Sequence, residues 1–95
     1  MTDPVVTHVP ERSRYELRLG DELIGLADYH RRDNRIAFTH TEVDPDRRER
    51  GLGSRLVKAA LDDAERQGLD VIPLCPFVAR YIEEHPEYAK LVPAD

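Results

Sequence analysis

An arginine- and glycine-rich segment near the middle of the chain has the residue types that hold an anion. Arg47, Arg48 and Arg50 stand before Gly51 and Gly53, and an amphipathic run begins directly after them. A helix start carries unpaired backbone N–H groups and a partial positive charge, so it attracts negative groups. Glycine lets an anion approach the backbone, and guanidinium groups stay charged near neutral pH. The segment therefore predicts a cradle for a pyrophosphate.

Two other interpretations of this segment compete with the cradle. A solvated loop that ends in a glycine-rich helix cap would use the same residue types. A nucleotide-binding P-loop fits poorly, because no Gly-Lys-(Ser/Thr) sequence follows the turn. The chain has a net charge of −5, yet three of its 14 basic residues fall within this short segment. A small polyanion explains that local charge better than a nucleic acid, which binds a broad basic surface.

The chain's one cysteine is the second residue that could do chemistry. Cys75 follows an apolar run and precedes Pro76, which suits the first turn of a helix. A helix N-terminus lowers the pKa of a thiol from its free value of about 8.5. His40, on a predicted strand that should face Cys75, would lower that pKa further. The alternative is that Cys75 is a small buried apolar residue.

An imidazole and a carboxylate on the same predicted strand could move protons. His40 is expected on the same strand face as Phe38 and Glu42. An imidazole takes up and releases protons near neutral pH, which suits a general base. Glu42 would orient His40, or would accept a proton from an ammonium through a water. The alternatives are a histidine satisfied within the sheet and a solvated carboxylate at a strand end.

The elements that must position these residues follow from hydrophobic periodicity and turn residues. Residues 1–12 form either a frayed start or a short edge strand. Apolar alternation then predicts three antiparallel strands, and a helical period that begins at Gly51 is closed by Gly68. A further strand and a proline-started helix follow. The predicted spans are 15–19, 22–30 and 35–43 for the strands, 51–67 for the helix, 69–74 for the next strand and 77–84 for the last helix.

This order, β-β-β-α-β-α, predicts an α+β fold (α/β in some schemes) in a single domain over residues 1–95. The helix between the third and fourth strands lets them lie parallel, with a right-handed crossover. Pro73 cannot donate to a sheet ladder, so the fourth strand must lie at an edge or leave its neighbour there. The two strands would then separate and open a slot above the glycine-bearing helix start.

Composition and residue spacing indicate the cellular compartment, the use of metals and the oligomeric state. A mean hydropathy of −0.60, a lone cysteine and an N-terminus without a secretory signal predict a cytoplasmic protein with no membrane partner. His8, His30 and His85 lack the spacing of metal ligands, so no metal is expected. No unexplained apolar stripe stands out, which makes a monomer the default expectation.

Four segments of the sequence carry a resemblance to a known family. They are Arg48-x-x-Gly51-x-Gly53 between Val43-x-Pro45 and Leu56, the runs Phe38 to Val43 and Leu74 to Val78, and Tyr81-x-x-x-His85-Pro86-Glu87-Tyr88. The first block resembles the acetyl-CoA signature of GNAT-type N-acetyltransferases, (Arg/Gln)-x-x-Gly-x-(Gly/Ala). The other blocks are similar to a compact subgroup, the N-acetyltransferase-domain-containing proteins. The resemblance covers residues 15–92.

The resemblance implies a GNAT-like mixed sheet whose central strands splay apart to hold acetyl-CoA, the co-substrate. The pyrophosphate would rest on backbone amides, and the pantetheine arm would pair with the strand before them. The implied cofactor-binding residues are Val43, Arg48, Glu49, Arg50, Gly51, Leu52, Gly53 and Ser54. Glu49 departs from the family pattern, which often has glycine there, and its negative charge must be offset by Arg47 and Arg50.

The resemblance also assigns roles in catalysis. The thioester would point toward His40 and Cys75, and Tyr81 would take the place of a tyrosine that protonates the leaving thiolate. The alternative for Tyr81 is a core aromatic packed on the sheet. Two routes stay open: His40 or Glu42 deprotonates the amine for direct attack, or the Cys75 thiolate takes the acetyl group first.

The expected function is therefore an acetyl-CoA-dependent N-acetyltransferase acting on an amine, carried by a small molecule or a protein. The alternative is a non-catalytic module that binds acetyl-CoA or CoA as a sensor or interaction domain. The sequence does not identify the acceptor, although an acidic protein attracts cationic amines. A nucleic-acid partner is disfavoured by the same acidic balance.

Overall fold

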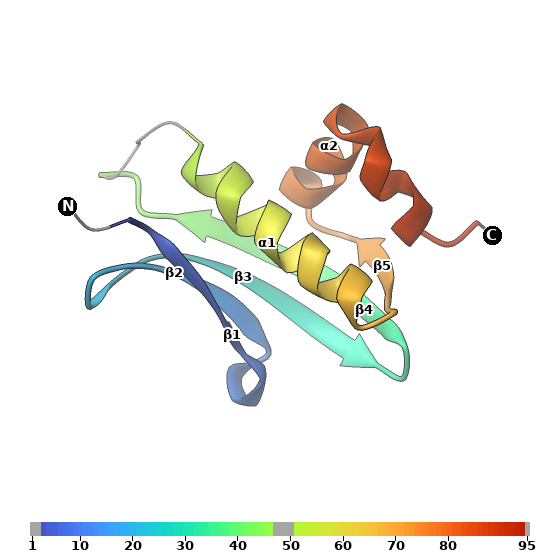
Figure 1. The fold of residues 1–95 in the computed structure, drawn as a ribbon, viewed down its shortest axis with the longest axis horizontal. Helices are drawn as coiled ribbons and strands as arrows, with labels where there is room; N and C mark the ends of the chain where they lie inside the picture. The colour runs from blue at the N-terminus through green and yellow to red at the C-terminus, as the bar shows by residue number, and fades with distance from the viewer. Residues whose placement is uncertain (1–2, 47–50, 95) are drawn as a thin grey trace.

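Alternating apolar and polar residues build four antiparallel strands in succession. The computed structural model describes residues 3–46 and 51–94. Its strands β1 to β4 are joined by short turns and lie side by side in chain order (Figure 1). Their bounds are β1 (Val5–Val9), β2 (Arg14–Leu19), β3 (Glu22–Arg32) and β4 (Arg35–Val43). The N-terminal segment, expected to be frayed or a short edge strand, is thus an edge strand paired with β2.

The remaining elements cross the sheet and return to its far edge. The helix α1 (Leu52–Arg66) ends before Gly68, whose φ of 72° is the left-handed conformation expected of a helix-terminating glycine. The strand β5 (Asp70–Pro73) pairs only with β4, so its proline lies on an edge strand as predicted. The chain ends with α2 (Pro76–Glu84) and a 3-10 helix, η2 (Pro86–Leu91), and a short 3-10 turn, η1 (Pro10–Arg12), links the first two strands.

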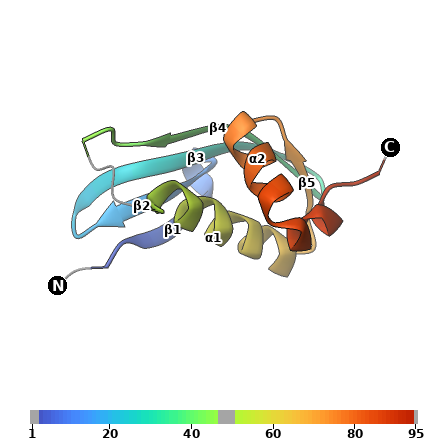
Figure 2. The same cartoon turned by 90° about the horizontal axis from the view of Figure 1, so that it is seen from above.

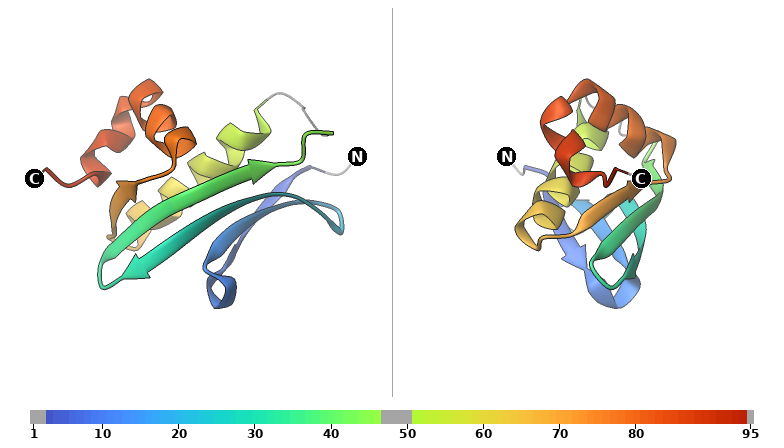
Figure 3. Two further views of the ribbon diagram at one scale, coloured as in Figure 1. Left: turned by 180° about the vertical axis from the view of Figure 1, so that it is seen from behind. Right: turned by 90° about the vertical axis from the view of Figure 1, so that its right-hand side faces the viewer.

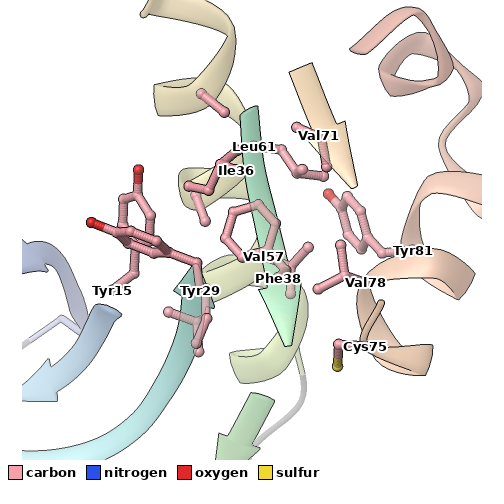
Figure 4. Close-up of a cluster of buried hydrophobic side chains, with 14 of the residues drawn as sticks. Tyr15, Tyr29, Ile36, Phe38, Val57, Leu61, Val71, Cys75, Val78 and Tyr81 are labelled. Atoms are coloured by element: carbon pink, nitrogen blue, oxygen red, sulfur yellow. The ribbon is translucent and has the colours of Figure 1, made fainter. Parts of the chain in front are cut away.

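Both α-helices cover the same face of the sheet and leave the other face open. Figure 2 shows α1 beneath the strands and α2 running downward beside it from the level of β4, and the left view of Figure 3 shows β4 in front of α1. The core lies between these layers, where Phe38 of β4 meets Val57 of α1 and Val78 of α2 (Figure 4). Each of these three side chains is almost fully buried. The mixed α+β fold predicted from the sequence is confirmed.

The parallel pair formed by β4 and β5 is short. Its register runs from Arg35 opposite Asp70 to Phe38 opposite Pro73, and there it stops. Beyond this pair, the backbone N–H of Cys75 donates to the carbonyl of Phe38 at 2.8 Å. The strand β4 continues to Val43 without β5 beside it. The two strands therefore part near Pro73, as the proline predicted.

Candidate functional site

A β-bulge in β4 decides which side chains can meet. His40 pairs with Asp28 of β3, and Phe38 pairs with the next residue, Tyr29, so Thr39 has no partner of its own. An extra residue of this kind shifts the alternation of the strand by one position. Phe38 faces the helices, whereas His40 on the far side of the bulge does not. The expectation that His40 shares a face with Phe38 is therefore wrong.

Thr41, rather than His40, is the β4 side chain that meets Cys75. The thiol of Cys75 donates to the Thr41 hydroxyl, with 3.5 Å between sulfur and oxygen. Cys75 is the N-cap of α2, as predicted, and only 5% of it is exposed. The expected pairing of Cys75 with His40 fails because the bulge exchanges the faces of the two β4 residues.

The surroundings of Cys75 favour its thiolate. Burial by itself raises the pKa of the thiol, but the Thr41 hydroxyl and the backbone N–H groups of Val78 and Phe77 outweigh it. The pKa of Cys75 therefore lies below that of a free thiol. Neither N–H group makes a capping hydrogen bond to the neutral thiol, so both act mainly on the charged form. The helix start lowers the pKa as the sequence predicted, without an imidazole.

His40 and Glu42 form a pair of their own on the open face. The Nε2 atom of His40 lies 3.5 Å from an oxygen of Glu42, and both side chains are more than half exposed. The idea that Glu42 orients His40 fits this arrangement. The His40–Glu42 pair lies on one face of β4, and the Cys75 thiol lies against the other face.

The edge of β4 beyond Phe38 offers backbone groups to a ligand. The N–H of Asp44 donates to the carbonyl of Ile24 in β3 at 2.8 Å. Because successive residues of a strand direct their backbone groups to opposite edges, Val43 and Thr41 direct theirs away from β3. Among residues 3–46 and 51–94, no strand pairs with that edge after β5 ends. It can therefore pair with an extended amide-containing chain.

The head of α1 is built as an anion site would be. Its N-cap, Gly51, has a φ of 84°, and no side chain caps the helix within the described part of the chain. The Leu52 side chain is buried in the core. The backbone amides of Leu52, Gly53 and Ser54 form the first turn of the helix. The predicted ligands Arg48, Glu49 and Arg50, and the neighbouring Arg47, lie outside the described residues.

An aromatic ring that the sequence reasoning did not single out lies against this helix start. A Cβ added to Gly53 would lie 2.7 Å from the Cζ atom of Phe77, so the absent side chain makes room for the ring. Phe77 is 45% exposed and borders a hollow of about 460 Å³ together with Ser54, Arg80 and Tyr81. The Phe77 ring, which belongs to the first turn of α2, therefore lies against the first turn of α1.

Tyr81 is a buried residue of α2 that borders the same hollow. Its ring stacks on His85 with 3.9 Å between centroids, and only 6% of it is exposed. Burial raises its pKa above 10.0; the positive charge of Lys58 lowers that pKa by less, and the negative charge of Asp62 raises it further. Figure 4 shows its hydroxyl directed away from Cys75. The structure does not bring these two residues together, and a role for Tyr81 in the reaction stays a prediction.

No group of three or more histidine, cysteine or acidic side chains in residues 3–46 and 51–94 is arranged to hold a metal ion. In the same residues, no helix has the length and apolarity needed to cross a membrane.

Comparison with known proteins shows which family the chain belongs to. The family model described as GCN5-related N-acetyl-transferase matches residues 14–91. Protein NATD1 of Mus musculus is 31% identical over 84 residues, which cover 85% of this chain and 76% of that protein. Protein NATD1 of Danio rerio is 27% identical over 92 residues, covering 92% and 83%. The chain belongs to the GCN5-related N-acetyltransferase family.

Solved structures share the fold. The solution structure of a GCN5-like protein from Staphylococcus aureus has a TM-score of 0.72 and 20% identity, covering 96% of this chain and 89% of that one. A Bacillus subtilis acetyltransferase in complex with CoA has a TM-score of 0.55 and 20% identity, covering 75% and 63%. The family and the fold support acetyl transfer from acetyl-CoA as the general chemistry of this protein.

Proposed function

We propose that this protein transfers the acetyl group of acetyl-CoA to an amine. The observation that carries the proposal is the unpaired edge of β4, which runs from Phe38 toward the uncapped head of α1. An extended pantetheine arm can pair with the backbone of Thr41 and Val43, and a pyrophosphate fits the amides of Gly51 to Ser54. Each hydrogen bond to a charged group contributes about 1.5–3 kcal/mol, so a few convergent amides are enough to hold it.

His40 and Glu42 are proposed to take the proton from the acceptor ammonium. In the direct route the amine nitrogen forms a bond to the acetyl carbon, the carbon–sulfur bond breaks, and CoA leaves as a thiolate that takes up a proton. In the second route the Cys75 thiolate bonds to the acetyl carbon while the carbon–sulfur bond to CoA breaks and CoA leaves as a thiolate that takes up a proton; the amine nitrogen then bonds to the acetyl carbon and Cys75 leaves as a thiolate. The lowered pKa of Cys75 supports this route, and its burial opposes it. Tyr81 is the proposed proton donor to the leaving thiolate.

The first experiment separates binding from chemistry. A ligand that binds only the folded protein raises its melting temperature, so acetyl-CoA should raise it and free pantetheine should do so less. Release of CoA in the presence of a panel of amines then measures transfer. Stabilisation without release of CoA by any amine would instead favour a binding module. No stabilisation by acetyl-CoA would contradict the proposal.

The second experiment separates the two routes. In the two-step route Cys75→Ala abolishes release of CoA, and an acetyl mass increment appears on Cys75 of the unaltered protein. In the direct route Cys75→Ala retains release and no increment forms. Tyr81→Phe should lower turnover while leaving the stabilisation by acetyl-CoA unchanged, because the ring and its packing remain.

A further inference from the structure

A second hollow is bordered by Glu42 of the His40–Glu42 pair. It lies at the open end of the hairpin formed by β3 and β4, opposite the turn that joins them. Its volume is about 310 Å³, near the lower end of the roughly 300–1,000 Å³ that small-molecule sites occupy. Its lining combines apolar side chains with two carboxylates. The residues that border it are Leu23, Ile24, Gly25, Leu26, Glu42, Val43, Asp44 and Pro45.

Strand register places apolar surface directly beside a carboxylate in this hollow. Leu26 of β3 is the cross-strand partner of Glu42, so the two side chains are neighbours on the open face. Leu23, 38% exposed, extends the apolar surface along β3. Asp44 adds a second carboxylate, which accepts the backbone N–H of Asp46 at 2.9 Å. An occupant with a hydrocarbon chain and a positive charge matches this lining.

Two arginines of the open face, Arg14 and Arg18, form ion pairs with carboxylates that do not border this hollow. Arg18 donates twice to one oxygen of Glu16, with a shortest distance of 2.9 Å. Arg14 lies 3.7 Å from the other oxygen of Glu16 and 3.4 Å from Asp28. Among the residues that the structure describes, the partner of Glu42 is His40. None of the described residues that border the hollow is positively charged, so a carboxylate carried by the occupant would meet the carboxylates of Glu42 and Asp44.

We propose that this hollow is the acceptor site and that its ligand is a primary ammonium on an aliphatic chain with no carboxylate beside the amine. The inference rests on the proposed transferase function. Glu42 attracts the ammonium, Leu23 and Leu26 contact its hydrocarbon chain, and His40 stands next to the nitrogen. The acceptor comes from the face without helices, whereas Cys75 and the head of α1 belong to the other side of β4.

Three matched amines test the inference. Butylamine has the proposed chemistry, norvaline is butylamine with a carboxylate on the carbon that bears the amine, and norvalinamide replaces that carboxylate by a neutral amide. With acetyl-CoA and the full chain, kcat/KM for norvaline should be lower than for norvalinamide by about tenfold or more. Equal kcat/KM values for these two amines would overturn the inference while leaving the transferase proposal intact.

Substitutions then locate the site. Glu42→Gln should lower kcat/KM for butylamine about tenfold and narrow the gap between norvalinamide and norvaline. Glu83→Gln, the same change on α2, should alter neither kcat/KM for butylamine nor the ratio of kcat/KM between norvalinamide and norvaline. Leu23→Ala should reduce the preference for butylamine over ethylamine. Stabilisation by acetyl-CoA should be unchanged in all three variants.

The outcomes separate the two proposals. If CoA is released but Glu42→Gln behaves like Glu83→Gln, the acceptor site lies elsewhere and the inference is overturned. If none of the amines releases CoA although acetyl-CoA stabilises the protein, the transferase proposal and the inference fail together.

Discussion

The Cys75 thiol and the Thr41 hydroxyl are hydrogen-bonded at 3.5 Å although they lie 34 residues apart in the chain. The contact joins the N-cap of α2 to β4 at the place where β5 has left the sheet. The thiol of the single cysteine in the sequence therefore lies where β4 and β5 separate. A change at Thr41 should be felt at Cys75.

Thr41→Val should raise the pKa of Cys75. The hydroxyl favours the thiolate, whereas burial opposes it, so losing the hydroxyl leaves the opposing effect in place. The ultraviolet absorbance of the thiolate, followed against pH, measures the change, and the single cysteine makes the signal unambiguous. Thr39→Val is the control, because the Thr39 hydroxyl donates to the backbone of Asp28 instead. Equal titration curves for the two variants would show that Thr41 does not act on the thiol.

Gly51→Ala should weaken acetyl-CoA binding in addition to destabilising the fold. Gly51 and Gly68 both have a positive φ, and a Cβ on either would meet nothing within 4 Å. Alanine in this conformation costs about 1–2 kcal/mol at each position. Urea denaturation should therefore show similar losses for Gly51→Ala and Gly68→Ala. Calorimetric titration should show weaker acetyl-CoA binding in Gly51→Ala alone, and equal affinities would contradict an anion site at the head of α1.

Gly53→Ala should reduce acetyl-CoA affinity by about tenfold, which corresponds to 1.4 kcal/mol. The new Cβ would stand 2.7 Å from the Phe77 ring and beside the amides proposed to hold the pyrophosphate. The exposed ring can move, and alanine is a better helix former than glycine by about 1 kcal/mol, so the fold should survive.

The double variant Gly53→Ala with Phe77→Ala separates two causes of that loss. Removing the ring relieves its clash with the new Cβ but leaves the methyl group at the helix start. Affinity should therefore stay low in the double variant, measured by the same titration. Full recovery would mean that the displaced ring, rather than the methyl group, blocks the ligand.

Asp63→Asn should destabilise the protein near neutral pH by about 2 kcal/mol. The Asp63 carboxylate accepts the hydroxyl of Tyr15 at 2.6 Å and the amide of Gln67 at 2.7 Å. Burial alone raises the pKa of Asp63, but these bonds and the one from Arg66 bring it below 3.8. A lowered carboxyl pKa means that the stabilisation is complete above 3.8 and is lost as the pH falls through the folded value.

The difference between the unaltered protein and Asp63→Asn should therefore shrink in acid. Urea denaturation at neutral pH and at a pH below 3.8 measures the difference in the free energy of unfolding between the two proteins at each pH. Asp21→Asn, in the exposed turn after β2, is the control and should change stability little at either pH. A gap that does not depend on pH would contradict the assignment of charge to Asp63.

Local patterns in the chain were sufficient to predict most of the elements. The span 35–43 is a strand with those bounds, because its β-branched and aromatic residues favour a strand and polar turns flank it. Pro73 and Pro76 mark the end of β5 and the start of α2, since a proline constrains its own backbone wherever it stands. These features depend on residues close in sequence, so they are readable without the fold.

The bulge at Thr39 left a signal that the sequence reasoning missed. Apolar residues occupy even positions at Ile36 and Phe38, and the next one, Val43, is odd. A change of parity within one strand is typical of an inserted residue. That signal would have moved His40 and Glu42 to the open face.

The glycine-bearing helix start, the capping position of Cys75 and the family could all be derived from the order of residues, because each depends on a local backbone preference or a short motif. The partner of Cys75 and the hollow beside Glu42 could not. They arise where β4 meets α2 and β3, elements brought together only when the core packs. A bulge that shifts one strand by a single residue exchanges every later side chain between faces, so contacts across the sheet follow from the folded register.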